Sequence, residues 1–186
     1  MRVIGGELGG RRLLVPRGGK VRPTSDLVRE AIFNILGPVW IYQRVLDLFA
    51  GTGALGIEAL SRGAVEAVFV EQGRSALKFI RGNLDALNLT SRAMVLPVAA
   101  KRGIKVLAEK GEKFDLIFMD PPYGKDLVGV TLQEICQRGI LSLTGVIVAE
   151  HSSVEAASFP QSLELSLQRR YGDTAISIYR GTSSLP

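Results

Sequence analysis

Apolar runs of β-strand length alternate with helical stretches along most of this chain. Five such runs are apolar at nearly every position: residues 45–50, 67–71, 93–98, 114–119 and 145–150. Because they lack the alternation of a half-exposed strand, they predict strands buried on both faces of a sheet. Helix-forming composition and apolar spacing mark the segments between them: residues 54–62, 75–87, 101–110 and 127–137. This order predicts an α/β fold with a parallel sheet covered on both sides.

The C-terminal part of the chain departs from this alternation. Residues 163–170 and 174–180 flank the turn Tyr171-Gly172-Asp173 and predict an antiparallel hairpin. Together with the five central strands, the hairpin gives a doubly wound, mostly parallel, seven-stranded sheet with one antiparallel edge strand. This arrangement differs from the strand order of dinucleotide-binding folds.

The N-terminal part predicts a small extension to the sheet. Residues 2–4 and 12–15 flank glycines and are expected to pair as a short hairpin. Thr24 or Ser25 is then expected to cap a helix that runs through Leu36 and ends at Gly37-Pro38.

Positive charge is concentrated in the same part of the chain. Residues 1–22 contain six basic side chains and one acid, a net charge of +5 that equals the formal charge of the whole chain. Clustered arginine and lysine release counterions on meeting a polyanion, so the segment predicts a phosphate-binding surface. The residues expected to meet phosphates are Arg2, Arg11, Arg12 and Lys20. The alternative is a solvated basic arm without a partner.

Length and composition limit the remaining possibilities. With 186 residues, 46% of them hydrophobic, we expect a single domain over residues 1–186, with the hairpin and helix in 1–36 and the core in 45–180. No segment resembles a signal peptide or reaches the roughly 18 apolar residues of a membrane span, so a soluble cytoplasmic protein is expected. Cys136 and His151 are the only residues of their types and cannot form an ordinary zinc site, so we expect no metal. A structural role is assigned to His151.

The first candidate site follows the strand at residues 45–50. Glycines match the pattern G-x-G-x-x-G, which lets the backbone approach a bound cofactor closely where a strand turns into a helix. Asp47 stands inside the apolar strand, where a lone carboxylate needs hydrogen-bond donors or a cationic ligand. The cofactor-binding residues predicted in this stretch are Asp47, Ala50, Gly51, Thr52, Gly53 and Gly56.

A second acid supports a cofactor that contains adenosine. Glu71 ends the second strand, 20 residues after Gly51. An acid at this position accepts hydrogen bonds from both ribose hydroxyls of an adenosine, in NAD as in S-adenosylmethionine. If the cofactor is S-adenosylmethionine, the ammonium of its methionine moiety suits Asp47.

The sequence Asp120-Pro121-Pro122-Tyr123 favours S-adenosylmethionine. The two prolines donate no backbone hydrogen bonds and hold the turn rigid, which leaves carbonyl groups free at the carboxyl edge of the sheet. Asp120 and the Pro121 carbonyl can each accept one hydrogen of an NH2 group on a flat base, and Tyr123 can stack on the ring. Held in this way, the nitrogen directs its lone pair toward a methyl donor. Either Asp120 or water takes the released proton.

These motifs resemble those of amino-group methyltransferases, with residues 45–56 as the cofactor loop and residues 120–123 as the catalytic signature. The stretch at residues 22–34, which begins Arg22-Pro23-Thr24-Ser25-Asp26, resembles the N-terminal motif of the RsmD family, bacterial guanine-N2 methyltransferases of 16S ribosomal RNA. The resemblance covers nearly the whole chain. It implies a class I methyltransferase (Rossmann-like) fold, S-adenosylmethionine as cofactor and 16S rRNA in a partly assembled small subunit as partner. It also implies that Arg22, Thr24 and the following helix form a flap beside the methionine end of the cofactor.

One stretch departs from the pattern of related enzymes. After the third strand these enzymes usually carry an acid that contacts the adenine amino group, whereas this chain has Leu96-Pro97-Val98-Ala99-Ala100. We expect adenine to bind there through backbone groups and apolar contacts.

Other functions remain open on the sequence alone. The same cofactor can serve methylation of adenine N6 in DNA or RNA, or of a protein glutamine amide. An NAD-dependent oxidoreductase explains the glycine loop and Glu71 but leaves residues 120–123 without a role. A non-enzymatic alternative is an RNA-binding assembly protein with a vestigial site.

Overall fold

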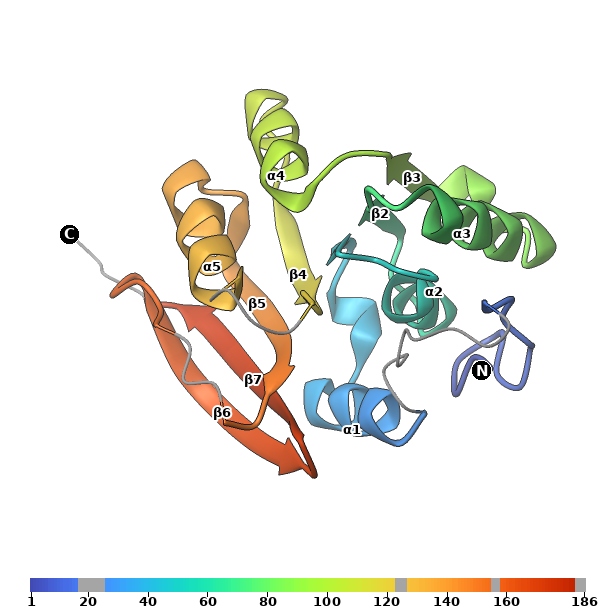
Figure 1. The fold of residues 1–186 in the computed structure, drawn as a ribbon, viewed down its shortest axis with the longest axis horizontal. Helices are drawn as coiled ribbons and strands as arrows, with labels where there is room; N and C mark the ends of the chain where they lie inside the picture. The colour runs from blue at the N-terminus through green and yellow to red at the C-terminus, as the bar shows by residue number, and fades with distance from the viewer. Residues whose placement is uncertain (17–25, 123–126, 155–157, 183–186) are drawn as a thin grey trace.

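A computed structural model describes residues 1–16, 26–122, 127–154 and 158–182. One seven-stranded sheet in the order β3-β2-β1-β4-β5-β7-β6 runs through it (Figure 1). The strands are β1 (Arg44–Leu48), β2 (Glu66–Val70), β3 (Ala93–Leu96), β4 (Phe114–Met119), β5 (Leu141–Ser152), β6 (Leu163–Tyr171) and β7 (Thr174–Gly181). Neighbours among β1 to β5 pair in parallel, whereas β7 pairs antiparallel with β5 and β6. The predicted α/β fold with a mostly parallel, doubly wound sheet is confirmed.

The C-terminal hairpin closes the sheet differently from the prediction. The antiparallel strand β7 lies between β5 and β6, so the edge strand β6 runs parallel to the central strands. The prediction of an antiparallel edge strand is therefore wrong. Residues 174–179 of β7 are all buried, whereas most of β6 is exposed. The strand with the more apolar surroundings takes the inner position, and the more polar strand takes the edge.

Helices cover both faces of the sheet. In the described part of the chain the α-helices are α1 (Asp26–Leu36), α2 (Ala54–Ser61), α3 (Arg74–Ala86), α4 (Ala100–Glu109) and α5 (Leu127–Arg138). α1, α2 and α3 pack on one face, and α4 and α5 pack on the other (Figure 1). In β1, Val45 faces the first group and Leu46 and Leu48 face the second. Because side chains alternate along a strand, Asp47 points toward the face that α1 to α3 cover.

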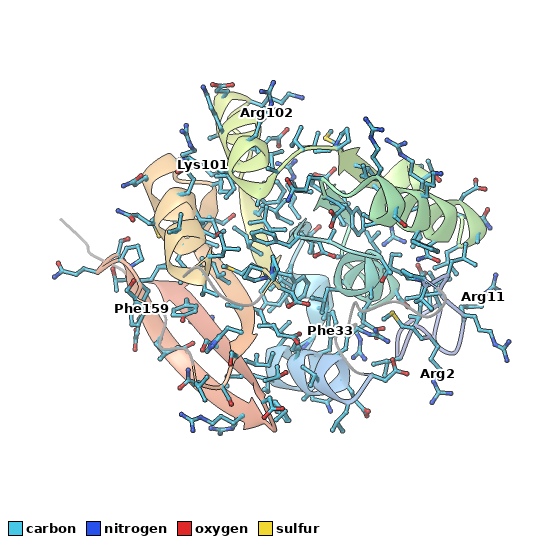
Figure 2. All side chains as sticks on the ribbon, viewed as in Figure 1. Arg2, Arg11, Phe33, Lys101, Arg102 and Phe159 are labelled. Carbon is cyan, nitrogen blue, oxygen red and sulfur yellow. The ribbon has the colours of Figure 1, made fainter. Side chains whose placement is uncertain are left out.

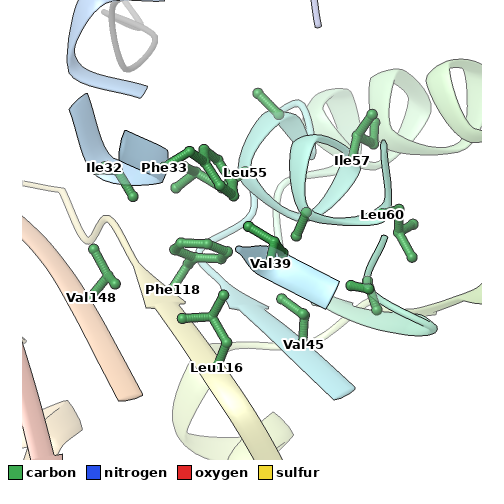
Figure 3. Close-up of a cluster of buried hydrophobic side chains, with 14 of the residues drawn as sticks. Ile32, Phe33, Val39, Val45, Leu55, Ile57, Leu60, Leu116, Phe118 and Val148 are labelled. Atoms are coloured by element: carbon green, nitrogen blue, oxygen red, sulfur yellow. The ribbon is translucent and has the colours of Figure 1, made fainter. Parts of the chain in front are cut away.

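The core on this face fixes α1 above the end of β4. Ile32 and Phe33 of α1 lie over Phe118 of β4, with Leu55 of α2 beside them (Figure 3). The ring centroids of Phe33 and Phe118 are 5.6 Å apart, with an interplanar angle of 56°. Phe118 is fully buried and lies two residues before Asp120. The packing therefore holds α1 close to the candidate catalytic segment.

β5 is longer than its apolar run predicts. It begins at Leu141 instead of residue 145. The apolar run did not reveal this first part, because Ser142 and Thr144 are polar and the strand is exposed at residues 143 and 144. His151 lies near its other end and is buried. Its ring nitrogens lie 2.8 Å from Ser177 Oγ and 2.9 Å from the carbonyl oxygen of Ser152. The structural role predicted for His151 is confirmed.

The N-terminal segment reverses direction as predicted but does not form two paired strands. Its ladder within residues 1–16 is a single antiparallel bridge between Arg2 and Arg12. The backbone N–H groups of Ile4 and Gly5 donate to the carboxylate of Glu58 in α2 instead of to a partner strand. The segment is thereby bound to α2 instead of forming an independent hairpin. Thr24 and Ser25, the predicted caps of α1, lie outside the described residues.

None of the helices in the described ranges is both long enough and apolar enough to cross a lipid bilayer.

Candidate functional site

A cavity of about 980 Å³ lies at the carboxyl ends of the parallel strands. In doubly wound sheets, ligands bind at this edge where the strand order reverses, and here that point lies between β1 and β4. The volume falls at the upper end of the range of about 300–1,000 Å³ that is typical of small-molecule sites. The residues predicted from sequence that line the cavity are Asp47, Ala50, Gly51, Thr52, Glu71, Asp120, Pro121 and Pro122. The structure therefore brings the two predicted motifs together around one cavity.

The glycine loop turns sharply as it leaves β1. Phe49, Gly51 and Gly53 have φ values of 59°, 57° and 79°, in the left-handed region that glycine adopts at low cost. The N–H of Ala50 donates to the carbonyl of Val70, which ties the start of the loop to β2. Residues 49–52 all line the cavity, and Gly51 leaves the backbone at the centre of this stretch without a side chain.

Gly53 and Gly56 support the loop from outside the cavity. Neither residue is part of the cavity wall. A Cβ atom at Gly56 would lie 2.4 Å from the ring of Phe69, so only glycine lets α2 pack this closely on β2. Gly56 is the third glycine of the G-x-G-x-x-G pattern, and its role is to let the helix pack closely on the strand.

Asp47 is a buried carboxylate on the floor of the cavity. It is 2% exposed, and its Oδ2 accepts a hydrogen bond of 2.9 Å from the N–H of Gly56. The pKa of Asp47 is raised to about 8, mainly because the carboxylate is buried; the negative charges of Asp120 and Glu71 contribute to the rise, and the Gly56 hydrogen bond opposes it. A cationic group bound beside Asp47 would favour the ionised carboxylate. The position therefore suits a ligand with a positive charge.

Glu71 is held in place by two backbone groups. One carboxylate oxygen accepts a hydrogen bond of 2.9 Å from Gly51 N–H, and the other accepts one of 2.6 Å from Gly73 N–H. An ionised carboxylate has about four acceptor positions, so both oxygens can accept further hydrogen bonds from a ligand. Glu71 thus joins the glycine loop to the end of β2 and still faces the cavity.

Asp120, Pro121 and Pro122 form the wall that follows β4. Each of them lines the cavity, and Pro121 is buried. Asp47 lies opposite Phe118 in the pairing of β1 with β4, two residues before Asp120, and the negative charge of Asp120 contributes to the raised pKa of Asp47. Tyr123, predicted to stack on a base, lies outside the described residues. So do Arg22 and Thr24, which were predicted to bind the cofactor.

Several cavity residues were not predicted from the sequence as site residues. They come from the N-terminal segment, α1, the end of β5 and the turn of the C-terminal hairpin, and include Met1, Pro16, Leu27, Val28, Glu150, Tyr171, Gly172 and Thr174. A signal for Glu150 was present in the sequence, because an acid ends an otherwise apolar strand. The N-terminal residues gave no such signal, since only the fold brings them to the cavity.

The cavity wall that follows β3 is apolar. Val98 and Ala100 line the cavity there. Backbone contacts around them hold this loop, with Val98 N–H donating to the carbonyl of Leu96. The geometry agrees with the expectation of apolar contacts in place of a carboxylate.

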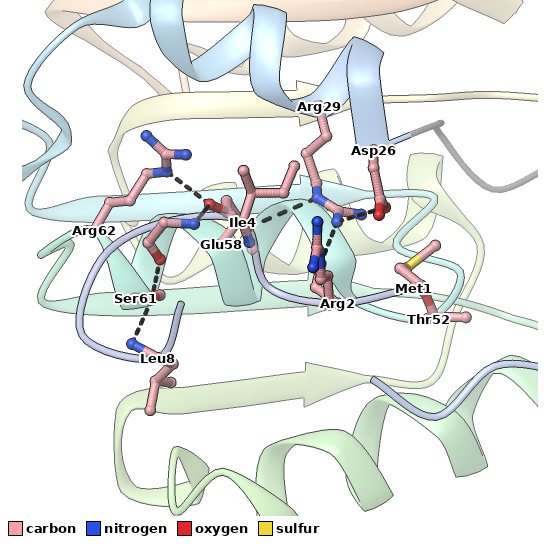
Figure 4. Close-up of polar contacts among 12 residues, drawn as sticks. Met1, Arg2, Ile4, Leu8, Asp26, Arg29, Thr52, Glu58, Ser61 and Arg62 are labelled. Atoms are coloured by element: carbon pink, nitrogen blue, oxygen red, sulfur yellow. Dashed lines mark hydrogen bonds and ion pairs between the residues drawn. The ribbon is translucent and has the colours of Figure 1, made fainter. Parts of the chain in front are cut away.

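A separate polar network joins the N-terminal segment to α1 and α2 (Figure 4). Glu58 is fully buried and accepts hydrogen bonds from Ile4 N–H, Gly5 N–H and Arg62 Nε. The buried Arg29 of α1 lies 3.8 Å from the same carboxylate through its Nε, and its Nη2 donates to the carbonyl of Arg2. Met1 and the α1 residues Leu27 and Val28 line the cavity, so the network joins two elements that contribute to its wall.

The basic residues predicted to meet phosphates lie on the surface. Arg2, Arg11 and Arg12 are exposed, and Arg2 and Arg11 project from the N-terminal segment at one end of the molecule (Figure 2). Lys20 lies outside the described residues. The described residues Arg2, Arg11 and Arg12 do not line the cavity, so any contact they make with a polyanion lies outside it.

Comparison with known proteins agrees with this geometry. The family model described as conserved hypothetical protein 95 matches residues 1–180. YlbH of Bacillus subtilis (strain 168), whose name assigns it provisionally to the rRNA methyltransferases, is 41% identical over 97% of this chain and 98% of its own length. Ribosomal RNA small subunit methyltransferase D of Escherichia coli (strain K12) is 36% identical over 97% of this chain and 89% of its own length.

The fold of a solved relative is also similar. The structure of yhhF from Escherichia coli, provisionally named a methyltransferase, superposes with a TM-score of 0.84 at 35% identity and covers 97% of both chains. The predicted class I methyltransferase (Rossmann-like) fold is thereby confirmed, as is the predicted family. The chain belongs to the RsmD family, whose model bears the description conserved hypothetical protein 95.

Proposed function

We propose that this chain transfers a methyl group from S-adenosylmethionine to the exocyclic N2 amine of a guanine in 16S rRNA, within a partly assembled small ribosomal subunit. The names of its relatives support methylation of ribosomal RNA. The cavity supports the chemistry, and the observation that carries the proposal is that the glycine loop, Glu71 and Asp120 all line it. A ribosomal RNA substrate also supports a location in the cytoplasm.

The half of the cavity beside β1 and β2 suits the cofactor. Glu71 is oriented to accept hydrogen bonds from ribose hydroxyls, and the backbone of Gly51 leaves room for a close approach. Asp47 takes the ammonium of the methionine moiety, directly or through water, and Arg22 and Thr24 complete that end of the site. S-adenosylmethionine supplies an electrophilic methyl group on a sulfonium.

The half of the cavity beside β4 suits the acceptor base. The Asp120 carboxylate and the Pro121 carbonyl each accept one hydrogen of the amine, which keeps its lone pair directed at the methyl donor. Pro122 keeps the turn rigid because proline fixes φ, and Tyr123 stacks on the base. Positioning and electrostatics account for most of the catalysis, because no covalent intermediate with the protein is required. Asp120 or water then takes the proton that the nitrogen loses.

The basic N-terminal segment suits the RNA. Arg2, Arg11, Arg12 and Lys20 contact phosphates near the target nucleotide, while base recognition takes place in the cavity. This division is common in nucleic-acid recognition, where phosphate contacts position the polymer and base contacts give specificity.

Two measurements on the purified protein test the proposal. Thermal unfolding with S-adenosylmethionine, S-adenosylhomocysteine or NAD should show stabilisation by the first two, by RT ln(1 + [L]/Kd) if they bind only the folded state, and none by NAD. Transfer of labelled methyl groups to small-subunit particles from cells that lack the enzyme should then yield N2-methylguanosine. Stabilisation by NAD alone, or a labelled product on adenine N6, would overturn the assignment.

A further inference from the structure

A second carboxylate lies beside Asp120 in the cavity. Glu150 is near the end of β5, lines the cavity and is 7% exposed. β4 and β5 pair in parallel with Met119 opposite Ala149, so the next residues are Asp120, which directly follows β4, and Glu150 of β5. Adjacent strands are about 4.8 Å apart, which sets the scale of the separation between the two backbone positions.

Both carboxylates point toward the same face of the sheet. Phe118 and Val148, two residues before Asp120 and Glu150, belong to the core cluster under α1, α2 and α3. Met119 and Ala149 belong to the cluster on the opposite face. By the alternation of side chains, Asp120 and Glu150 therefore return to the first face, where the cavity opens.

Glu150 lies on the side of Asp120 that is away from the cofactor residues. In the sheet, β4 separates β5 from β1 and β2, which carry Asp47 and Glu71. On its other side Glu150 is opposite Ile176 of β7, and Thr174 and Tyr171 of the adjoining hairpin also line the cavity. This order places Glu150 where an acceptor base would lie, between the catalytic segment and the hairpin turn.

The chemistry of a carboxylate at this position selects among bases. On its Watson–Crick edge guanine presents two neighbouring donors, N1–H and the N2 amine, whereas the N1 of adenine is an acceptor. An ionised carboxylate only accepts hydrogen bonds, so it is matched to guanine and repelled by the lone pair of adenine N1. Burying a carboxylate is costly, and a donor on the ligand offsets part of that cost.

We propose that Glu150 accepts the N1–H of the target guanine and thereby selects guanine over adenine, while Asp120 and Pro121 hold the N2 amine. This inference rests on the proposed function, because it assigns the recognition of the base within the same site. The two carboxylates then have different roles. Asp120 accepts a hydrogen bond from the reacting N2 amine, and Glu150 accepts one from the neighbouring ring N1–H.

The test uses a small-subunit RNA substrate with either guanosine or 2-aminopurine riboside at the position that the wild-type protein methylates. 2-Aminopurine keeps the N2 amine but has a lone pair at N1 in place of N1–H. The measured quantity is the ratio of kcat/KM for guanine to kcat/KM for 2-aminopurine. Loss of the O6 atom in 2-aminopurine affects wild type and variant alike, so it cancels when their ratios are compared.

The wild-type ratio should be at least about 10-fold, since it includes the loss of one charge-assisted hydrogen bond. Glu150→Gln should reduce it by roughly 10- to 100-fold, because the amide NH2 can donate to N1 of 2-aminopurine but accepts less strongly from guanine. Glu164→Gln, which alters an exposed acid in β6, should leave the ratio unchanged. Thermal unfolding and S-adenosylhomocysteine affinity check that each variant is folded.

The outcomes separate this inference from the proposed function. If folded Glu150→Gln keeps the wild-type ratio, Glu150 does not read N1, although guanine-N2 methylation stands. If the wild-type protein methylates guanine and 2-aminopurine equally well, the inference is also overturned. This outcome does not depend on whether Glu150→Gln folds. If wild type forms no N2-methylguanosine, the proposed function itself has failed.

Discussion

Two buried carboxylates in adjacent elements have very different surroundings. Glu58 of α2 accepts hydrogen bonds from two backbone N–H groups and from Arg62, with Arg29 also close to it. Asp47 of β1 accepts one hydrogen bond from the described residues, from Gly56, and borders the cavity. The protein itself supplies the partners of Glu58, whereas Asp47 lies where a ligand can supply them.

This difference distinguishes an acid with a structural role from an acid that we propose binds a ligand. A buried charge is costly unless donors or opposite charges surround it. The hydrogen bonds and ion pairs of Glu58 offset the cost of burying its charge, and they attach residues 1–5 to α1 and α2. For Asp47 the hydrogen bond from Gly56 offsets only part of the cost of burying the charge, and its pKa is accordingly raised to about 8. Substitution of Glu58 should therefore reduce stability, whereas substitutions in the cavity should alter binding and turnover.

The largest effect is expected for Glu58→Ala. Removing one partner of a buried ion pair costs about 3–5 kcal/mol, because Arg29 and two backbone donors lose their acceptor. For a chain of this size the loss should lower Tm by on the order of 10 °C, measured by thermal and urea unfolding. Glu66→Ala serves as the matched control, since the Glu66 pair with Arg44 is partly exposed and contributes less than about 1 kcal/mol. Equal destabilisation by both substitutions would remove the distinction between structural and surface acids.

Asp120→Ala should affect turnover instead of stability. Loss of an oriented acceptor for the reacting amine should lower kcat by roughly 10²- to 10³-fold. Affinity for S-adenosylhomocysteine should change much less, because the glycine loop and Glu71 are intact. Asp85→Ala, at an exposed position in α3, should leave kcat unchanged. Near wild-type turnover in Asp120→Ala would eliminate the role assigned to this carboxylate.

Asp47 should make stability depend on pH in the absence of ligand. The native pKa of about 8 lies above the value of 3.8 for an unperturbed Asp, so between these pH values the folded chain binds more protons than the unfolded chain. Stability should therefore fall as pH rises toward 8, by roughly 2 kcal/mol between pH 6 and pH 8. Asp47→Asn should remove this contribution and bind S-adenosylmethionine more weakly. Urea unfolding at several pH values measures the slope, and identical slopes for wild type and Asp47→Asn would refute the assignment.

The smallest effect per residue is expected on the basic surface. Replacing Arg2, Arg11 and Arg12 with Gln should reduce the log–log salt slope of RNA binding by about 0.7–0.9 for each arginine that binds a phosphate in the wild-type complex. KM for RNA should rise, while S-adenosylmethionine affinity should persist. Lys105, Lys110 and Arg138 on or beside α4 and α5 do not line the cavity, and their replacement with Gln provides a control of equal charge. If both triple variants bind RNA with the wild-type slope, the N-terminal segment is only a solvated surface.

Much of the fold could be predicted because its central strands are buried on both faces. Nearly continuous apolar runs and a regular alternation with helices predicted the succession of β1 to β5 along the chain and their parallel pairing. A strand that ends in a glycine loop predicted the position of the cavity. The inner position of β7 was missed because local sequence shows a hairpin but not which of its strands meets β5. Burial of residues 174–179 decides this point, and burial is a property of the whole sheet.

The meeting of predicted site residues around one cavity could be foreseen where a motif is local. Asp47, Glu71 and Asp120 each stand at or near the end of an apolar strand, so their meeting at one sheet edge follows from parallel pairing. The N-terminal segment was harder, because Glu58 intercepts the backbone donors of Ile4 and Gly5 across more than 50 residues of sequence. No local pattern in residues 1–16 contains that information.

The central claim is that the protein methylates the N2 amine of a guanine of 16S rRNA bound in this cavity. Mass spectrometry of rRNA from a deletion strain tests this claim most directly. The deletion should remove one N2-methylguanosine from 16S rRNA. Complementation with wild type should restore it, and complementation with Asp120→Ala at the same protein level should not. An unchanged set of N2-methylguanosines in the deletion strain, or full restoration by Asp120→Ala, would contradict the account.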